Sequence, residues 1–152
     1  MTMWLDAILA YLHFTVIFVL FAFLVAEIVI FRGPLDPWSI RLLGRLDPWY
    51  FGAAAAVLAT GIARLLFGAK GPGFYLTGWP IYVKLALFLA VGLISIGPSV
   101  RFIRWRRSLE RDSQWRVPEA ERAKVRRALM IEVHLAALIP LVAVIMARGL
   151  AR

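Results

Sequence analysis

The chain has 152 residues, of which 62% are hydrophobic, and its mean hydropathy of +0.78 is far above that of soluble domains. This composition predicts an integral membrane protein with a single transmembrane domain over residues 1–152. The chain contains no cysteine, which excludes disulfides, thiolate metal sites, iron–sulfur clusters and thiol catalysis. In a soluble protein, a net charge of +9 would suggest binding to nucleic acid. In a membrane protein it can instead reflect basic cytoplasmic loops, so the positions of the basic residues distinguish the two explanations.

The first predicted span covers about residues 4–31 and carries its ionisable side chains on one stripe. Asp6, His13 and Glu27 are separated by multiples of seven residues. Residues seven apart return to nearly the same face of an α-helix, so the stripe is about 31 Å long, roughly one hydrocarbon thickness. Polar side chains at this depth are expected to face other helices and not lipid.

The tripeptide Asp-Pro-Trp occurs twice, at residues 36–38 and 47–49. Each copy predicts a helix start, because Asp is favoured as an N-cap and Pro at the first helical position. We therefore expect a short interfacial helix over residues 37–43, ended by Gly44, and a second span over about residues 48–68.

The second span contains a ladder of small residues, Gly52, Ala56 and Thr60, at every fourth position. Such a ladder lets two helix backbones approach closely, and it also permits a homo-oligomer. Arg64 lies about one turn from the outer end of this span. Its side chain is expected either to extend to the interface or to bind an anion or carboxylate.

Two further spans are predicted over about residues 78–101 and 127–148. The third span carries Lys84, and the fourth carries Glu132 and His134. These last two side chains point roughly 200° apart on a helix. The predicted fold is therefore all-α: a transmembrane bundle of four helices, with a short interfacial helix between the first two spans.

Basic residues are concentrated between the third and fourth spans, where ten occur: Arg101, Arg104, Arg106, Arg107, Arg111, Arg116, Arg122, Lys124, Arg126 and Arg127. The connection between the first two spans is also basic. The opposite side has three basic residues at or beyond the ends of the spans: Lys70, Arg148 and Arg152. The positive-inside rule therefore predicts a bacterial inner-membrane protein with cytoplasmic basic connections and both termini outside. The charge is then explained by topology and by attraction of residues 101–127 to anionic lipid headgroups, and no nucleic-acid partner is expected.

Counting along the helices places Lys84, His13 and His134 about 8, 13 and 20 Å below the outer surface. Imidazole suits iron, copper and zinc, and two histidines on facing helices commonly hold haem b. This outer layer therefore predicts either a cofactor site or simple hydrogen bonds between helices.

An inner layer consists of Glu27 and Glu132, each about 7 Å from the inner surface. These two carboxyl groups could share a proton, act as a proton relay, or pair with Arg32 or Arg126 at the helix ends. Pairing with the arginines is the simplest of these interpretations.

Three short motifs carry a family resemblance: His13 in an aromatic-rich first span, Gly78-Trp79 followed by Lys84-Leu85, and residues 127–132 opening the fourth span. With these motifs the chain resembles the HemJ-type protoporphyrinogen oxidases and the wider superfamily that includes copper-resistance membrane proteins. It is also similar to a family of small bacterial four-span membrane proteins of uncharacterised function. The resemblance implies an oxidoreductase of redox or tetrapyrrole chemistry that binds haem b through His13 and Lys84, with a role for the acidic residue at Glu132.

The chain departs from the HemJ-type pattern at residues 31–32 and 95–96, where that family commonly has Tyr-His, and at His134, where it tends to have proline. His13 with His134 and His13 with Lys84 both remain candidate pairs of ligands for the haem iron. Two alternatives also remain open, a cofactor-free structural or assembly protein and a metal-ion transporter.

Overall fold

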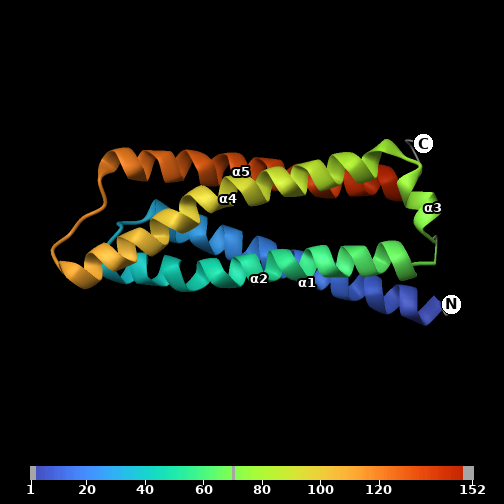
Figure 1. The fold of residues 1–152 in the computed structure, drawn as a ribbon, viewed down its shortest axis with the longest axis horizontal. Helices are drawn as coiled ribbons and strands as arrows, with labels where there is room; N and C mark the ends of the chain where they lie inside the picture. Colours follow the sequence, from blue (N-terminus) through green and yellow to red (C-terminus); the bar gives the residue numbers. More distant parts are fainter. Residues whose placement is uncertain (1–2, 70, 149–152) are drawn as a thin grey trace.

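The computed structural model describes residues 3–69 and 71–148, and most of this part forms four long helices (Figure 1). These are α1 (Met3–Arg32), α2 (Pro37–Phe67), α4 (Trp79–Arg111) and α5 (Glu119–Ala147), and a short helix, α3 (Gly71–Leu76), connects α2 to α4. Each long helix is long and apolar enough to cross a membrane, which confirms the predicted all-α, four-span class. Lys70 and Arg152, which were assigned to the outer side, lie outside the described residues.

The long helices form two hairpins. Helix α1 packs mainly against α2, and α4 mainly against α5. Contacts between α2 and α4 join the hairpins, whereas α1 and α5 touch at few points. As Figure 1 shows, α1 begins and α5 ends at the same end of the bundle, opposite the loop between α4 and α5. We call the end with that loop the basic end and the opposite end the far end.

The first Asp-Pro-Trp copy begins a helix as predicted. A side-chain oxygen of Asp36 accepts a hydrogen bond from the backbone N–H of Ser39 at 2.7 Å, and Pro37 is the first residue of α2. Hydrogen bonds from the backbone and side chain of Ser39 hold the pKa of the exposed Asp36 carboxyl below its ordinary value. The charged form that caps α2 is therefore favoured at neutral pH.

The expectation of a separate interfacial helix over residues 37–43 is wrong, because α2 continues through Gly44 and Pro48 to Phe67. Burial explains the continuity. Leu43 is fully buried immediately before Gly44, and such packing offsets the cost of glycine and proline within a helix.

The connection after α2 contains α3, which its glycine-rich sequence did not indicate. Gly71 has a φ of 71°, a left-handed conformation that favours glycine. Asp6 from α1 accepts a hydrogen bond from the backbone N–H of Ala69 at 3.1 Å. The outermost acid of the predicted stripe therefore holds the start of this connection.

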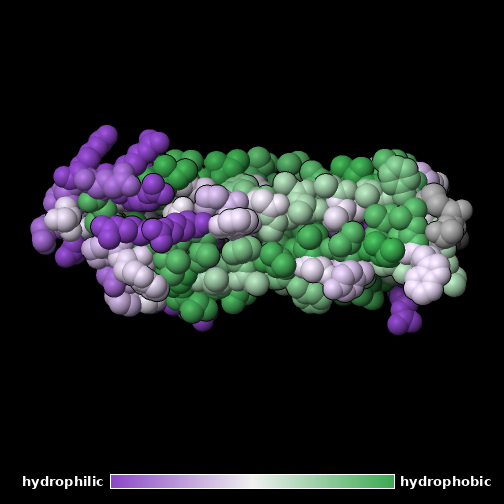
Figure 2. Space-filling view, turned by 90° about the horizontal axis from the view of Figure 1, so that it is seen from below, coloured by the Kyte–Doolittle hydropathy of each residue, from purple (hydrophilic) through white to green (hydrophobic). Residues whose placement is uncertain are grey.

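Helices α4 and α5 both extend beyond their predicted boundaries near residues 101 and 127. The extensions remain helical because they bury a second set of apolar side chains, among them Phe102, Trp105 and Val125. They also carry most of the basic residues, and Figure 2 shows hydrophilic side chains gathered at this end. Attraction of the basic end to anionic headgroups stays a prediction.

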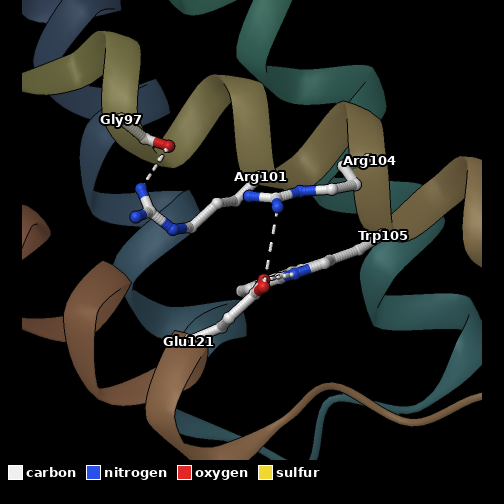
Figure 3. A network of polar contacts seen from close by, with 5 residues as sticks. All are labelled: Gly97, Arg101, Arg104, Trp105 and Glu121. Carbon is white, nitrogen blue, oxygen red and sulfur yellow. Dashed lines mark hydrogen bonds and ion pairs between the residues drawn. The ribbon is translucent and has the colours of Figure 1, made fainter.

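A polar network joins the two extensions (Figure 3). The indole Nε1 of Trp105 donates to Oε2 of Glu121 at 2.6 Å, and Arg104 forms an ion pair with Oε1 of the same residue at 3.7 Å. One turn earlier on α4, the Arg101 guanidinium donates to the backbone carbonyl of Gly97 at 2.9 Å. The first two contacts join α4 to α5 at the basic end.

The apolar core lies mostly in the half of the bundle nearer the basic end. Its largest buried apolar side chains are Leu24, Ile28, Phe31, Ile40, Leu43, Tyr50, Phe102, Trp105, Leu109 and Leu129. In the far half, large apolar side chains of all four long helices are exposed, among them Phe14, Ile62, Leu89 and Leu141. The buried apolar core is therefore concentrated toward the basic end.

Candidate functional site

His13 lies in the far half of α1 with only 3% of its surface exposed, and its ring faces α2. The Nδ1 atom is 2.9 Å from Oγ1 of Thr60. Thr60 donates its single hydroxyl hydrogen within its own helix, to the carbonyl of Ala56 at 2.7 Å. With that hydrogen directed to Ala56, the threonine oxygen accepts a hydrogen bond from Nδ1–H, and the ring lone pair lies on Nε2. In this tautomer Nε2 is the nitrogen that could bind a metal or accept a proton.

Gly61 provides the space for the imidazole. A Cβ atom added at Gly61 would lie 3.3 Å from Cε1 of His13. Gly52, the first residue of the predicted ladder, is on the exposed side of α2, and no heavy atom lies within 4 Å of a Cβ added there. At His13, α1 therefore packs against Thr60 and Gly61 of α2, whereas Gly52 faces the exposed side of α2.

Two basic side chains lie near His13. Lys84 from α4 and Arg64 from α2 are half-buried, and both are close enough to interact electrostatically with the imidazole. The Arg64 guanidinium carbon lies 5.7 Å from the ring centre of Phe14, a cation–π geometry. Its Nε atom is buried and has no hydrogen-bond partner in the described chain. The structure thus brings His13, Lys84 and Arg64 into one group, which we call the far-half polar group.

His134 does not belong to this group. Its side chain is exposed on α5, and Nδ1 donates to the carbonyl of Met130, one turn earlier, at 2.6 Å. Glu132 is only 1% exposed, and residues two apart point roughly 200° apart, so burial of Glu132 turns His134 outward. Of the two candidate ligand pairs, the structure therefore brings His13 near Lys84 and turns His134 to the exposed side of α5. Residues 3–69 and 71–148 contain no cluster of three or more His, Asp or Glu side chains suited to a metal ion.

A second polar group lies in the half nearer the basic end and receives side chains from all four long helices. Its members are all buried: Glu27, Asp47, Tyr50, Ser95, Ser99 and Glu132. From the sequence, only the two glutamates were predicted to lie in this layer, because Asp47 was predicted to be the N-cap of the second span. The signal that could have found the others is helical spacing, with Tyr50 three residues after Asp47 and Ser99 four residues after Ser95.

Short hydrogen bonds connect this second group across helices. Oγ of Ser99 on α4 donates to Oδ1 of Asp47 on α2 at 2.6 Å. Oγ of Ser95 donates to Oε1 of Glu132 on α5 at 2.6 Å, and the Tyr50 hydroxyl lies 3.1 Å from the same serine oxygen. The two serines therefore connect α2 and α5 through α4.

The expectation that Glu27 and Glu132 pair with Arg32 or Arg126 is wrong. Both arginines are exposed, and the ion pairs in the described part of the chain involve neither glutamate. One oxygen of each glutamate, Oε1 of Glu27 and Oε2 of Glu132, is instead buried without a hydrogen-bond partner among those residues. Extending an arginine into the core would have required removing its charge from the interface, which is costly in an apolar interior.

Comparison with known proteins covers nearly the whole chain. Residues 5–151 match the family model described as "Predicted membrane protein (DUF2214)". The chain belongs to the DUF2214 family. No curated protein and no solved structure matches it. Membership in DUF2214 agrees with four membrane-spanning helices in contact with a lipid bilayer, and the family description names no cofactor, substrate or reaction.

Proposed function

We propose that the protein binds haem b between its two hairpins in the far half of the bundle, with His13 and Lys84 as the iron ligands. The observation that carries this proposal is the state of His13. Nδ1 lies 2.9 Å from Oγ1 of Thr60, whose hydroxyl can donate to Ala56, so a buried His13 that donates from Nδ1 has its lone pair on Nε2. A metal-ligating histidine typically has this arrangement, because the hydrogen bond from the non-ligating nitrogen sets the tautomer and the ring orientation.

The chemistry of the neighbouring residues fits a haem group. Lys84 comes from the opposite hairpin and offers a second nitrogen ligand. The unused Nε–H of Arg64 suits a propionate carboxylate. Phe14 follows His13 in the chain and lies 5.7 Å from the Arg64 guanidinium, so its ring suits contact with the porphyrin. When bound, haem would supply one-electron redox chemistry, and the resemblance to the HemJ-type protoporphyrinogen oxidases favours a redox or tetrapyrrole-related role.

An absorption spectrum tests this proposal. Wild-type protein purified in detergent after expression with ample haem is expected to show a Soret band. His13→Ala should abolish the band, and Lys84→Met should shift or weaken it. His134→Ala is the matched control, because that histidine is exposed and bonded to its own helix, and it should leave the spectrum unchanged.

A colourless wild-type protein would contradict haem binding and favour the cofactor-free structural alternative. A band lost equally in His13→Ala and His134→Ala would contradict the assigned ligands. If haem is bound as proposed, an assay for oxidation of protoporphyrinogen by the haem-loaded protein would distinguish an enzyme from an electron carrier.

We also propose that the protein lies in a bacterial inner membrane with its basic end in the cytoplasm, in keeping with the charge asymmetry. The chain has no cysteine, so single introduced cysteines can report the orientation without background. Ala69 is exposed at the far end and Ser113 at the basic end. A membrane-impermeant maleimide applied to intact cells should label Ala69→Cys alone, and permeabilised cells should label Ser113→Cys as well. Labelling of Ser113→Cys alone in intact cells would reverse the orientation.

A further inference from the structure

We propose that the three buried carboxyl groups of Glu27, Asp47 and Glu132, here called the carboxyl cluster, form a proton-binding site. The hydroxyls of Ser95 and Ser99 allow the cluster to gain or lose its proton without rearrangement. This site is separate from the far-half polar group. The two groups share no residue, and on the α1 stripe the apolar Leu20 lies between His13 and Glu27. The inference therefore does not depend on haem.

The cluster contains acids without a compensating cation. Its carboxyl groups come from α1, α2 and α5, and α4 contributes only serine hydroxyls. The charged groups that act on Glu27 are Asp47 and Glu132, both acidic. The other titratable side chain facing the cluster is Tyr50 of α2, whose hydroxyl is neutral at physiological pH.

Electrostatics favours a proton at such a place. Carboxylate charges buried together repel one another and lack the water that would stabilise them, and no arginine or lysine in the described chain forms an ion pair with them. A bound proton removes one of the charges and turns an acceptor oxygen into a donor. Oε1 of Glu27 and Oε2 of Glu132, both buried without a partner, are two of the oxygens able to carry it.

Ser95 accommodates both states of Glu132. Its hydroxyl has one hydrogen but two acceptors within reach: Oε1 of Glu132 at 2.6 Å and the carbonyl of Val91 at 2.8 Å. When Glu132 is ionised, Ser95 donates to the carboxylate. When Oε1 carries a proton, the acid donates to Oγ of Ser95 and the serine hydrogen turns to Val91. Only hydrogen atoms need to move between the two states.

The same arrangement recurs one turn along α4. The Ser99 hydroxyl lies 2.6 Å from Oδ1 of Asp47 and 2.9 Å from the carbonyl of Ser95, so it too can donate to either acceptor. Asp47 and Glu132 therefore each face a hydroxyl that can be a donor or an acceptor.

Infrared spectroscopy tests this inference on full-length protein at neutral pH with no haem added, in dodecyl maltoside, a detergent that has no ester carbonyl. A protonated carboxylic acid has a carbonyl band that carboxylates lack and that shifts in heavy water. The band is expected in the wild type and should be lost in at least one of Glu27→Gln, Asp47→Asn and Glu132→Gln. Ser95→Ala should shift its frequency. The matched controls are Glu119→Gln and Ser113→Ala at exposed positions, and both should keep the wild-type band.

Two outcomes would overturn the inference. The first is a wild-type spectrum without the band, or with a band that all three carboxyl substitutions leave intact. The second is a band that disappears on addition of sodium chloride but not choline chloride, which would make the resident ligand a metal cation. Because a wild-type spectrum without the band overturns the inference by itself, and an unshifted band in Ser95→Ala would contradict the role of that serine, the test does not depend on every carboxyl variant folding. Failure here would leave the Soret prediction untouched, since the two sites share no residue.

Discussion

Trp105→Ala is expected to lower the free energy of unfolding by about 3–5 kcal/mol, the usual cost of removing a large aromatic side chain from a packed core. Trp105 is 0% exposed. Its ring stacks on Phe31 of α1 at 6.4 Å between centroids and meets Phe102 edge-on at 5.8 Å, while its Nε1 donates to Glu121 of α5. One side chain thus joins three helices at the basic end.

Exposed tryptophans provide matched controls for this experiment. Trp38 and Trp49 are 67% and 68% exposed, so alanine at either position should change the unfolding midpoint little in detergent. Trp105→Phe retains part of the packing but removes the N–H donor, and its midpoint should fall between those of the wild type and Trp105→Ala. Circular dichroism melts measure all four variants. Equal losses in Trp38→Ala and Trp105→Ala would contradict the central role of Trp105 in the core.

Gly61→Leu is expected to abolish the Soret band as completely as His13→Ala, although it leaves every candidate ligand in place. A Cβ at Gly61 would lie 3.3 Å from Cε1 of His13, so a larger side chain must displace the imidazole and break its contact with Thr60. Overpacking of this kind typically costs about 1–3 kcal/mol, so the variant should also melt at a lower temperature.

Gly52→Leu is the matched control for this change, because a Cβ at Gly52 meets no atom within 4 Å. It should keep both the spectrum and the melting temperature of the wild type. Size-exclusion chromatography of the same variant tests the predicted homo-oligomer, since a smaller assembly with an intact spectrum would place Gly52 between copies. A normal Soret band in Gly61→Leu would contradict the proposed position of the haem against His13.

Local sequence determined the four spans, because their signals need no tertiary contact. An apolar run of about 20 residues can avoid the cost of desolvating its backbone only by forming a helix within the membrane. The cap at Asp36 was equally local, since its oxygen bonds a backbone N–H three residues later. For the same reason, the opposite directions of Glu132 and His134 followed directly from helix geometry.

Helix ends were less predictable where packing overrode local signals. The second Asp-Pro-Trp copy has the same composition as the first, yet it lies inside α2, where Asp47 binds Ser99 on a helix more than 50 residues away in sequence. Likewise, hydropathy ended the third span near Arg101, whereas burial of Phe102 and Trp105 extends α4 to Arg111.

The sites required the tertiary structure, because a sequence states which residues share a face but not which helix that face meets. His13 and Lys84 could be recognised from depth and resemblance, but the tautomer of His13 depends on Thr60 across the α1–α2 interface. Of the carboxyl cluster, the sequence predicted only Glu27 and Glu132, as two glutamates at similar depth. Its third acid and its two serines join it through contacts of α2 and α5 with α4. What the sequence alone determined is therefore a four-span membrane protein with a polar interior, while helix packing decided which of those polar groups meet.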